Sequence, residues 1–480
     1  MNNTTIEAPV VSEKTRTVSD SDQRGILKLP SFMPEFLQED VRAESSSINT
    51  GSKDKPVMKK ISTLVFKGKH LNVSLDHEVS CPWCHKRLFH IGNTPCRLKH
   101  LPFGDTYTAL EVQRSRLLCP YCHYSYTYPL EFKADGHLIT TALNSFTEDL
   151  LAHGFNLKSV ALLTGLNKNI VKDIDLKRLK EKYTVDGMSL KKPDHYCKYL
   201  AIDEFKLHDH HKYATIIADL ETGHILWLAH GRKKASVYGF IEHAGKDFMD
   251  HVTAVACDMN SDFEEAFKER CEHIDIVYDR FHLLKNFNDK VISEVRKDEQ
   301  KRLKEEGDEK GAASLKNSRY ILTSSRKSRM RHDDDVLNNK LVCKESVLFN
   351  KPEKRASTFI EEKYRELINS NRLLFTADLV REQLDDMYSS IFEKDARDKL
   401  SEIIDTCKGT ENEHFLWFAR LLENHFDGIV AYSKHHISTS KLEGINNMIK
   451  TERRLGYGYP DDEYFFLRII DRSHRKDSSS

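Results

Sequence analysis

The feature that most limits the fold of this chain is a regular succession of short apolar segments between residues 198 and 279. Three strand-like runs, KYLAIDEF, KYATIIADL and HILWLAHG, follow one another with turn signals such as ETG between them. Neighbouring runs of this kind favour an antiparallel meander. The pattern continues as helix (VYGFIEHAGKDF), strand (VTAVACD), helix (DFEEAFKERC) and strand (DIVYD). We therefore expect an α/β domain in which a helix crosses over between the third and fourth strands.

Two matched cysteine pairs precede this domain, Cys81-Pro-Trp-Cys84 and Cys119-Pro-Tyr-Cys122. Each pair can form a turn whose backbone amides face two thiolates, and two such turns complete a tetrahedral zinc site. The gap between the pairs is longer than in the usual zinc ribbon, so we expect a β-hairpin to fill it. Because protein ligands occupy all four positions, the predicted single zinc ion is structural.

Other residues near the pairs leave alternatives open. One pair alone could arise by chance or act in redox chemistry, but two matched pairs argue against this. His85 and His123 each follow the second cysteine of a pair and could replace a thiolate, although the four-cysteine set is simpler. Cys96 lies alone between the pairs and is expected to be a buried apolar residue.

The segment LKSVALLTGLNKNIVKDID has the rhythm of a helix-turn-helix, with Gly165 near the turn. Its second helix would begin near Asn167 and present Lys168, Asn169 and Lys172 to a DNA groove. A plain helical hairpin gives the same pattern and is the alternative. The apolar positions of the motif are Val160, Leu163, Leu166, Ile170 and Ile174.

Three acidic residues occupy positions suited to a metal site. Asp203 and Asp258 each end a strand-like run, and Glu443 lies on a helix entered from the segment STS. Carboxylates at the strand ends of one sheet can converge, and three of them can hold two magnesium or manganese ions for phosphodiester chemistry. Spacing alone is weak support, because aspartate often ends a strand as a turn former and helical glutamate usually faces solvent.

Longer motifs give these acids more weight. They are CPWC and RLLCPYC; AIDEF, YATIIADLETGHIL and the GR of HGRKK; ACDMNSDFEEAF; IVYDRFHLLKNFNDKVISEVRK; LKNSRYIL; and SKLEGINNMIKTERRLGYGY. In this order they resemble the DDE transposases of the ISL3 family of bacterial insertion sequences over about residues 75–472. The resemblance implies a ribonuclease H-like core, with Asp203, Asp258 and Glu443 as its metal-binding catalytic triad.

The resemblance also assigns further residues. Asp279 and His282 form the D-x-x-H that such enzymes carry after the second aspartate, so both are catalytic candidates, with structural support as the equal alternative. On the last acidic helix, Glu443, Asn447 and Lys450 share a face. Asn447, Lys450, Arg453 and Arg454 are therefore DNA-binding candidates, while a solvated helix surface is the plainer interpretation.

These observations together predict an α/β fold: a ribonuclease H-like core split by an all-helical insertion, preceded by a small zinc-binding domain and a helix-turn-helix domain. The predicted parts are a disordered tail (1–60), the zinc domain (62–133), the helix-turn-helix domain (137–190), the first part of the core (196–295), the insertion (296–430) and the final core helix (431–472).

The function that follows is a transposase that binds terminal inverted repeats and catalyses metal-dependent cleavage and strand transfer of double-stranded DNA. Its 74 basic and 74 acidic residues balance, so DNA contacts are expected in local patches. No secretory signal or membrane span is predicted, and we expect a cytoplasmic, nucleoid-associated protein that is dimeric or larger at synapsis. The alternatives are a non-catalytic DNA-binding regulator and a nuclease acting on RNA hybrids.

Overall fold

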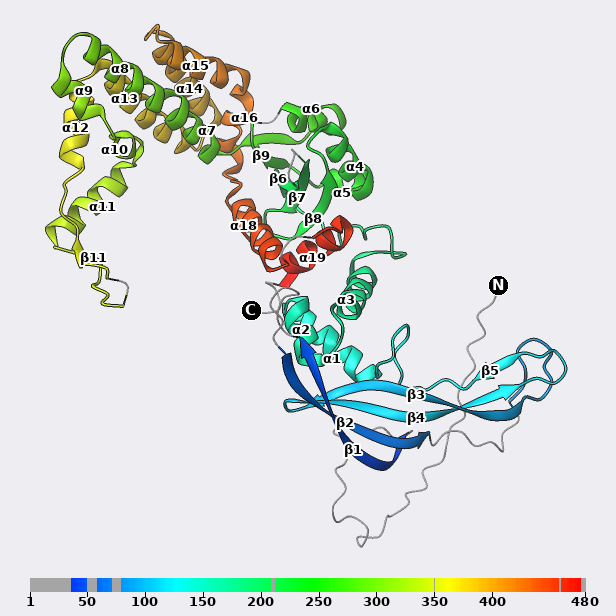
Figure 1. The fold of residues 1–480 in the computed structure, drawn as a ribbon. Coiled ribbons are helices and arrows are strands. Elements are labelled where there is room, and N and C mark those ends of the chain that lie inside the picture. The colour runs from blue at the N-terminus through cyan, green and yellow to red at the C-terminus, as the bar shows by residue number, and fades with distance from the viewer. Residues whose placement is uncertain are drawn as a thin grey trace. The chain divides into compact units, whose positions relative to one another are not determined.

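The computed structural model describes residues 36–49, 58–70, 79–208, 212–259, 261–348, 350–456 and 459–475. The chain divides into two compact units, Met1–Met188 and Ser189–Ser480. Each unit combines a sheet with helices, so the fold is mixed α/β as expected (Figure 1). None of the helices in the described ranges is both long enough and apolar enough to cross a membrane.

The first unit is built on a sheet of long strands in the order β1-β2-β4-β3, with β5 paired to β4. The strands are β1 (Phe36–Asn49), β2 (Met58–His70), β3 (Phe89–Phe103), β4 (Thr106–Leu118) and β5 (Ser125–Thr127). Strands β3 and β4 form an antiparallel hairpin between the two cysteine pairs, which confirms that expectation. Strand β2 runs parallel to β4 and antiparallel to β1.

The prediction of a disordered tail over residues 1–60 is wrong for β1 and for the start of β2. The sequence of β1 is mostly polar and shows no strand pattern. It forms a strand because β2 pairs with it and supplies the partners for its backbone hydrogen bonds. Phe36 is buried with Phe66 and Phe132 in one apolar cluster, which fixes the start of the strand. Residues 1–35 and 50–57 lie outside the described part of the chain.

Three helices follow the sheet: α1 (Thr141–Ala152), α2 (Leu157–Thr164) and α3 (Lys168–Tyr183). They share a small apolar core that includes Leu143, Val160 and Ile174. Gly165 ends α2 with φ of 68°, a left-handed conformation that glycine adopts without strain. Asn167 then caps α3, because its side chain accepts a hydrogen bond from the Asn169 amide at 2.9 Å.

The second unit contains a five-stranded sheet in the order β10-β9-β6-β7-β8. The strands are β6 (Tyr199–His208), β7 (Lys212–Asp219), β8 (Ile225–His230), β9 (Ala254–Cys257) and β10 (Asp275–Tyr278). Strands β6, β7 and β8 form the expected antiparallel meander, while β9 runs parallel to both β6 and β10. The crossover from β8 to β9 passes through α4 (Lys234–Ala244) and α5 (Lys246–Met249), and α6 (Ser261–Arg270) connects β9 to β10.

Helices fill the long stretch between β10 and the last two helices. They are α7 (Arg280–Phe287), α8 (Ser293–Glu305), α9 (Glu309–Leu315), α10 (Arg319–Thr323), α11 (Arg326–Leu337), α12 (Glu361–Asn369), α13 (Arg372–Tyr388), α14 (Glu393–Lys408), α15 (Glu413–Asn424), α16 (Phe426–Val430) and α17 (Tyr432–His435). Their apolar residues join those of the sheet in one continuous core. The expectation of an all-helical insertion is wrong at β11 (Leu341–Cys343) and β12 (Lys354–Arg355), which pair as a small hairpin.

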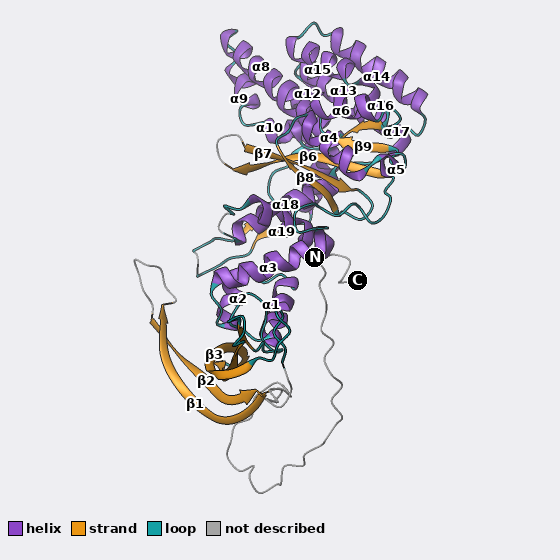
Figure 2. Ribbon diagram, turned by 90° about the vertical axis from the view of Figure 1, so that its right-hand side faces the viewer, coloured by secondary structure: helices purple, strands orange, loops and turns teal. Residues whose placement is uncertain are grey.

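The chain returns to the sheet with α18 (Ser440–Leu455) and α19 (Asp462–His474). Helix α18 packs against β6, and α19 packs against β8 (Figures 1 and 2). The other face of the sheet, through Leu200, Ile202 and Ile217, belongs to the core shared with α4 and α6. This arrangement brings Glu443, far along the chain, close to the strand that carries Asp203.

Candidate active site and cysteine cluster

Three acidic residues lie side by side across neighbouring strands of the second sheet because of the register of its parallel strands. Asp258 and Asp279 directly follow β9 and β10, as expected, whereas the prediction that Asp203 ends a strand is wrong, because β6 continues to His208. Ala201 on β6 pairs with Ala256 on β9, and continuing this register by two residues places Asp203 beside Asp258. Tyr278 on β10 pairs with Cys257, so one further residue places Asp279 beside Asp258. Neighbouring strands are about 4.8 Å apart, so the three backbone positions are adjacent.

Asp203 is partly buried and is held by two hydrogen bonds. Its Oδ1 accepts from the Glu204 amide at 2.7 Å, and its Oδ2 accepts from Nδ2 of Asn446 on α18 at 2.6 Å. Burial and the negative charge of Asp258 raise the pKa of Asp203 above its usual range, against the hydrogen bonds and the charge of His282. A cation placed between the two carboxylates would relieve this repulsion.

Asp258 is half exposed and forms an ion pair with His282, whose Nδ1 lies 3.3 Å from Oδ2 of the aspartate. The hydrogen bond to Asp258 raises the pKa of His282 against the opposing effect of burial. Burial alone would raise the pKa of Asp258, but the hydrogen bond and charge of His282 outweigh it and the pKa is lowered. His282 therefore stabilises the ionised form of Asp258.

Glu443 lies in the first turn of α18 and is exposed. It precedes Asn446 by three residues, so the two side chains are neighbours on one face of the helix, and Asn446 contacts Asp203. Within the described ranges, the ligand atoms of Asp203, Asp258 and Glu443 do not all lie within 4.8 Å of one another. The structure thus sets the two aspartates side by side and places Glu443 one helical turn from Asn446, which contacts Asp203.

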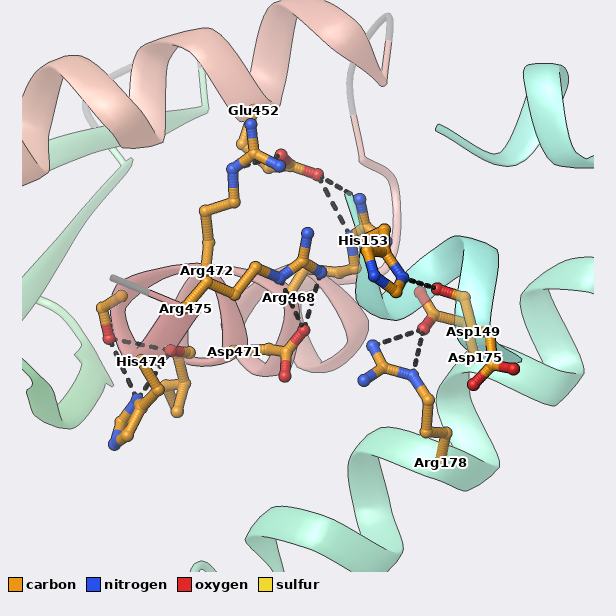
Figure 3. Close-up of polar contacts among 12 residues, drawn as sticks. Asp149, His153, Asp175, Arg178, Glu452, Arg468, Asp471, Arg472, His474 and Arg475 are labelled. Carbon is orange, nitrogen blue, oxygen red and sulfur yellow. Dashed lines mark hydrogen bonds and ion pairs between the residues drawn. The ribbon is translucent and has the colours of Figure 1, made fainter. Parts of the chain in front are cut away.

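Helix α18 is also fixed to its surroundings near its C-terminal end. Nη1 of Arg453 donates to the Lys206 carbonyl at 3.0 Å, which ties the helix to β6. Nη2 of Arg468 on α19 donates to the Glu452 carboxylate at 2.6 Å, and both side chains are almost fully buried. Figure 3 shows the two residues. Among the predicted DNA-binding residues of this helix, Asn447, Lys450 and Arg454 are exposed, whereas Arg453 is engaged with the strand.

Asp279 has a different environment from the other two aspartates. It is 5% exposed and caps α7 by accepting from the Phe281 amide at 3.1 Å. Its other carboxylate oxygen accepts a hydrogen bond from Oγ1 of Thr439, the residue just before α18. Sequence reasoning missed Thr439, since nothing in ISTSK shows that its hydroxyl meets a carboxylate 160 residues earlier.

The four cysteines of the first unit form one cluster, as the sequence predicts. Their sulfur atoms lie within 4.8 Å of one another. The closest pairs, each 3.4 Å apart, are Cys81 with Cys122 and Cys84 with Cys119. Cys96, by contrast, belongs to the apolar cluster of the long sheet, in agreement with its expected role.

Each cysteine pair closes a similar turn. The amide of His85 donates to the Cys81 carbonyl and the amide of His123 to the Cys119 carbonyl, both at 2.9 Å, and both histidines have positive φ of 57° and 59°. Burial opposes ionisation of Cys119, but the amides of Cys122 and Tyr121 outweigh it and lower the pKa of that thiol to about 6. Four sulfur atoms, two matched turns and backbone amides that favour the thiolates of Cys81 and Cys119 fit a tetrahedral zinc ion. Neither histidine belongs to the four-sulfur cluster.

The predicted recognition residues lie at the start of α3. Lys168 and Asn169 are exposed there, and Lys172 is partly buried one turn later. Further along α3, Asp175 is buried and bound to Arg178 at 2.8 Å, which holds the inner face of the helix (Figure 3). Leu163, on α2, is 45% exposed and is not part of the core that its position in the apolar rhythm suggested.

Comparisons with known proteins agree with the geometry. The sequence model of the ISL3 family of DDE transposases, described as "Transposase", matches residues 200–469, more than half of the chain. The transposase for insertion sequence element IS1001 of Bordetella parapertussis is 29% identical over 391 residues, covering 81% of this chain and 87% of that protein. The transposase for IS1557 of Mycobacterium tuberculosis is 29% identical over 85 residues, 18% of this chain and 19% of its own length. The chain therefore belongs to the ISL3 family of DDE transposases and is the transposase of an insertion sequence.

Proposed function

We propose that Asp203, Asp258 and Glu443 form the metal-binding catalytic site of this transposase. Family membership implies a divalent metal ion and DNA as a partner. The observation that carries the assignment is the strand register, which places Asp203 beside Asp258, together with the Asn446 bond that brings α18 to Asp203. The strand order, with three antiparallel strands followed by two parallel ones, supports a ribonuclease H-like core for residues 196–295 and 431–472.

The residues present fit two magnesium or manganese ions. Carboxylate oxygens are the ligands that such hard ions prefer. The Oδ1 atom of Asn446 is buried and has no hydrogen-bond partner among the described residues, so it can accept from a metal-bound water. Ions bound here would supply Lewis acidity to the attacking and leaving oxygens of a phosphodiester.

The side chains around the proposed metal site have different parts in this reaction. His282 holds the Asp258 carboxylate ionised, and Asn446 orients the Asp203 carboxylate. No ion pair or hydrogen bond of the Glu443 side chain occurs within the described ranges, so its carboxylate can turn toward the aspartates without breaking a contact. The nucleophile is water in the cleavage step and a DNA 3′ hydroxyl in the strand-transfer step.

Recognition of the element ends belongs, in this proposal, to the first unit. One structural zinc ion at the cysteine cluster stabilises the turns beside β3 and β4, and α3 enters a DNA groove with Lys168, Asn169 and Lys172. Asn447, Lys450 and Arg454 of α18 contact DNA near the cleaved phosphate, and Arg453 does so through the guanidinium nitrogens that its bond to the Lys206 carbonyl leaves unused. Because transposition joins two ends, we propose that the active form is a homodimer or a larger assembly.

A cleavage assay tests this function directly. The purified chain is incubated with a duplex that carries the inverted repeat found in the DNA flanking its reading frame. We expect cuts at the repeat boundary with magnesium or manganese, no cuts with EDTA, and joined products when target DNA is added. A protein that binds the repeat but never cuts it with either metal would instead be a DNA-binding regulator.

Replacing Asn169 by alanine is expected to weaken binding to the terminal repeat roughly tenfold, because one good contact to a base edge contributes about 1–3 kcal/mol. Replacing Lys168 should reduce the slope of log affinity against log salt by about 0.9, as expected for a phosphate contact. The matched control is Lys177→Ala, an exposed lysine two turns later on α3. Fluorescence anisotropy at several salt concentrations measures both effects, and equal affinities for all the variants would remove α3 from the interface.

Removing the Thr439 hydroxyl is expected to slow cleavage about tenfold, because Asp279 then no longer fixes the start of α18. We propose that Asp279 is a positioning residue, since both of its carboxylate oxygens are already engaged by protein groups. Thr439→Val should raise the metal concentration for half-maximal cleavage, and Thr439→Ser should restore it. The control is Ser438→Ala, which removes a hydroxyl whose bonds to described residues are with the hydroxyl and the amide of Ser440. Normal metal dependence in Thr439→Val would exclude this role.

A further inference from the structure

Two adjacent apolar side chains stand in solvent at the tip of the β11–β12 hairpin. Val347 is 91% exposed and Leu348 is 83% exposed. Ser346 and Lys351 form a bridge just below them, and the Asn350 amide donates to the Val347 carbonyl at 3.3 Å, which closes the turn. The bridge and this hydrogen bond flank the two apolar side chains, which have no packing partner in the described part of the chain.

The hairpin is basic, in contrast to the neutral chain as a whole. Residues 340–355 include five basic side chains and two acidic ones. Lys340 is paired with Asp335, and Arg355 with Glu353. The remaining basic residues, Lys344, Lys351 and Lys354, are exposed and form no ion pair with any described residue.

A buried polar cluster fixes the two chain segments from which the hairpin rises. Arg329 of α11 is 3% exposed, and its Nε lies 2.7 Å from the Glu361 carboxylate at the start of α12. The Arg329 guanidinium also lies 3.4 Å from the ring centroid of Tyr364. The Asp333 carboxylate accepts from the amides of Ile360 and Glu361 at 2.8 and 3.0 Å. The hairpin thus extends beyond α11 from a fixed base (Figure 1).

We infer that this hairpin is a DNA-contacting wedge: its free lysines bind phosphates while Val347 and Leu348 press against a base step in the minor groove. Aliphatic side chains inserted in this way unstack a step and bend the duplex. Lysine is depleted at the centre of protein interfaces, so three free lysines beside the tip favour a polyanion over a protein partner. The inference rests on the proposed cleavage of duplex DNA and adds a third contact site, on the helical insertion, to those proposed on α3 and α18.

The test uses the full chain and the inverted-repeat duplex with its flanking DNA, carrying 2-aminopurine at successive positions. With the wild-type protein we expect increased fluorescence at an unstacked step. In Val347→Ser/Leu348→Ser we expect this increase in fluorescence to disappear. The affinity for the duplex should fall about tenfold, because the two aliphatic side chains that the wild type buries against DNA are removed. The matched control is Ile391→Ser/Phe392→Ser, another exposed apolar pair (73% and 69%) on the same helical part.

Two further measurements separate the possible outcomes. Lys344→Gln/Lys351→Gln should lower the salt slope of binding by about 1.8, the value for two phosphate contacts. A photocrosslinking amino acid in place of Val347 should label DNA, whereas one in place of Ile391 should not. Crosslinks from position 347 to a second protein chain would contradict the proposed DNA wedge. So would unchanged fluorescence and affinity in Val347→Ser/Leu348→Ser. If the wild type still cleaves DNA, these results leave the proposed function intact. If the wild type fails to cleave, the proposed function itself is wrong.

Discussion

Replacing Asp203 or Asp258 by asparagine, or Glu443 by glutamine, is expected to lower the rate of DNA cleavage roughly a thousandfold while repeat binding stays within about twofold of the wild type. A thousandfold loss corresponds to about 4 kcal/mol in the activation barrier, a reasonable value for removing a ligand of a catalytic metal site. Binding should survive because α3 and the cysteine cluster belong to a different compact unit of the chain. Quenched-flow cleavage of labelled repeat DNA measures the first quantity, and anisotropy measures the second.

The matched control is Asp250→Asn, which neutralises an exposed acid that follows α5 and lies outside the proposed site. Metal binding at the site can also be measured without DNA cleavage. Ferrous iron bound in place of magnesium should cut the polypeptide near residues 203 and 258 when ascorbate and peroxide are added. These cuts should vanish in Asp203→Asn. Cleavage of DNA at the wild-type rate by all three variants would show that the acids are not the metal ligands.

The sheet that carries this site could be predicted from sequence because its strands are short, apolar and consecutive. The meander from β6 to β8 needs only local turns, and the α4 crossover follows from a helical segment placed between two strands. Strand β1 could not be predicted in this way. Its sequence is mostly polar, and the partner that satisfies its backbone is β2, on the far side of a connecting segment. The β11–β12 hairpin was hidden for a similar reason, because a short lysine-rich segment shows no alternation of polar and apolar residues.

The candidate site likewise contains some residues that could be placed from sequence and others that could not. Asp203 and Asp258 could be placed together from sequence, because both are predicted at strand ends of one sheet. This is correct for Asp258, which directly follows β9, but Asp203 lies in the middle of β6, and the parallel register of β6 and β9 sets it beside Asp258. The position of Glu443 could not, because the helical insertion separates it from Asp258 and only α18 packing on β6 brings it back. The family resemblance supplied that residue. The contacts that orient the site, Asn446 with Asp203 and Thr439 with Asp279, depend on the same tertiary packing and have no local signal.

Removing zinc from the cysteine cluster is expected to abolish specific repeat binding while leaving the second unit folded. The cluster closes two turns at the end of the β3–β4 hairpin, and only a small apolar group that includes Leu88 and Leu117 surrounds it. Four sulfur atoms held within 4.8 Å of one another need a cation to remain together as thiolates. In Cys119→Ser we expect zinc content to fall from one ion per chain to near zero and repeat affinity to fall at least about a hundredfold.

Cys96→Ala is the matched control, because Cys96 lies on β3 in the same unit but outside the cluster. It should keep one zinc ion and near-normal repeat affinity. Mass spectrometry of bound metal, with hydrogen exchange followed along the whole chain, separates the possible effects. Faster exchange should be confined to residues around the two turns and the nearby strands, while β6, β9 and α18 keep their protection. Retention of one zinc ion by Cys119→Ser, or loss of protection throughout the second unit, would contradict a local structural role for the cluster.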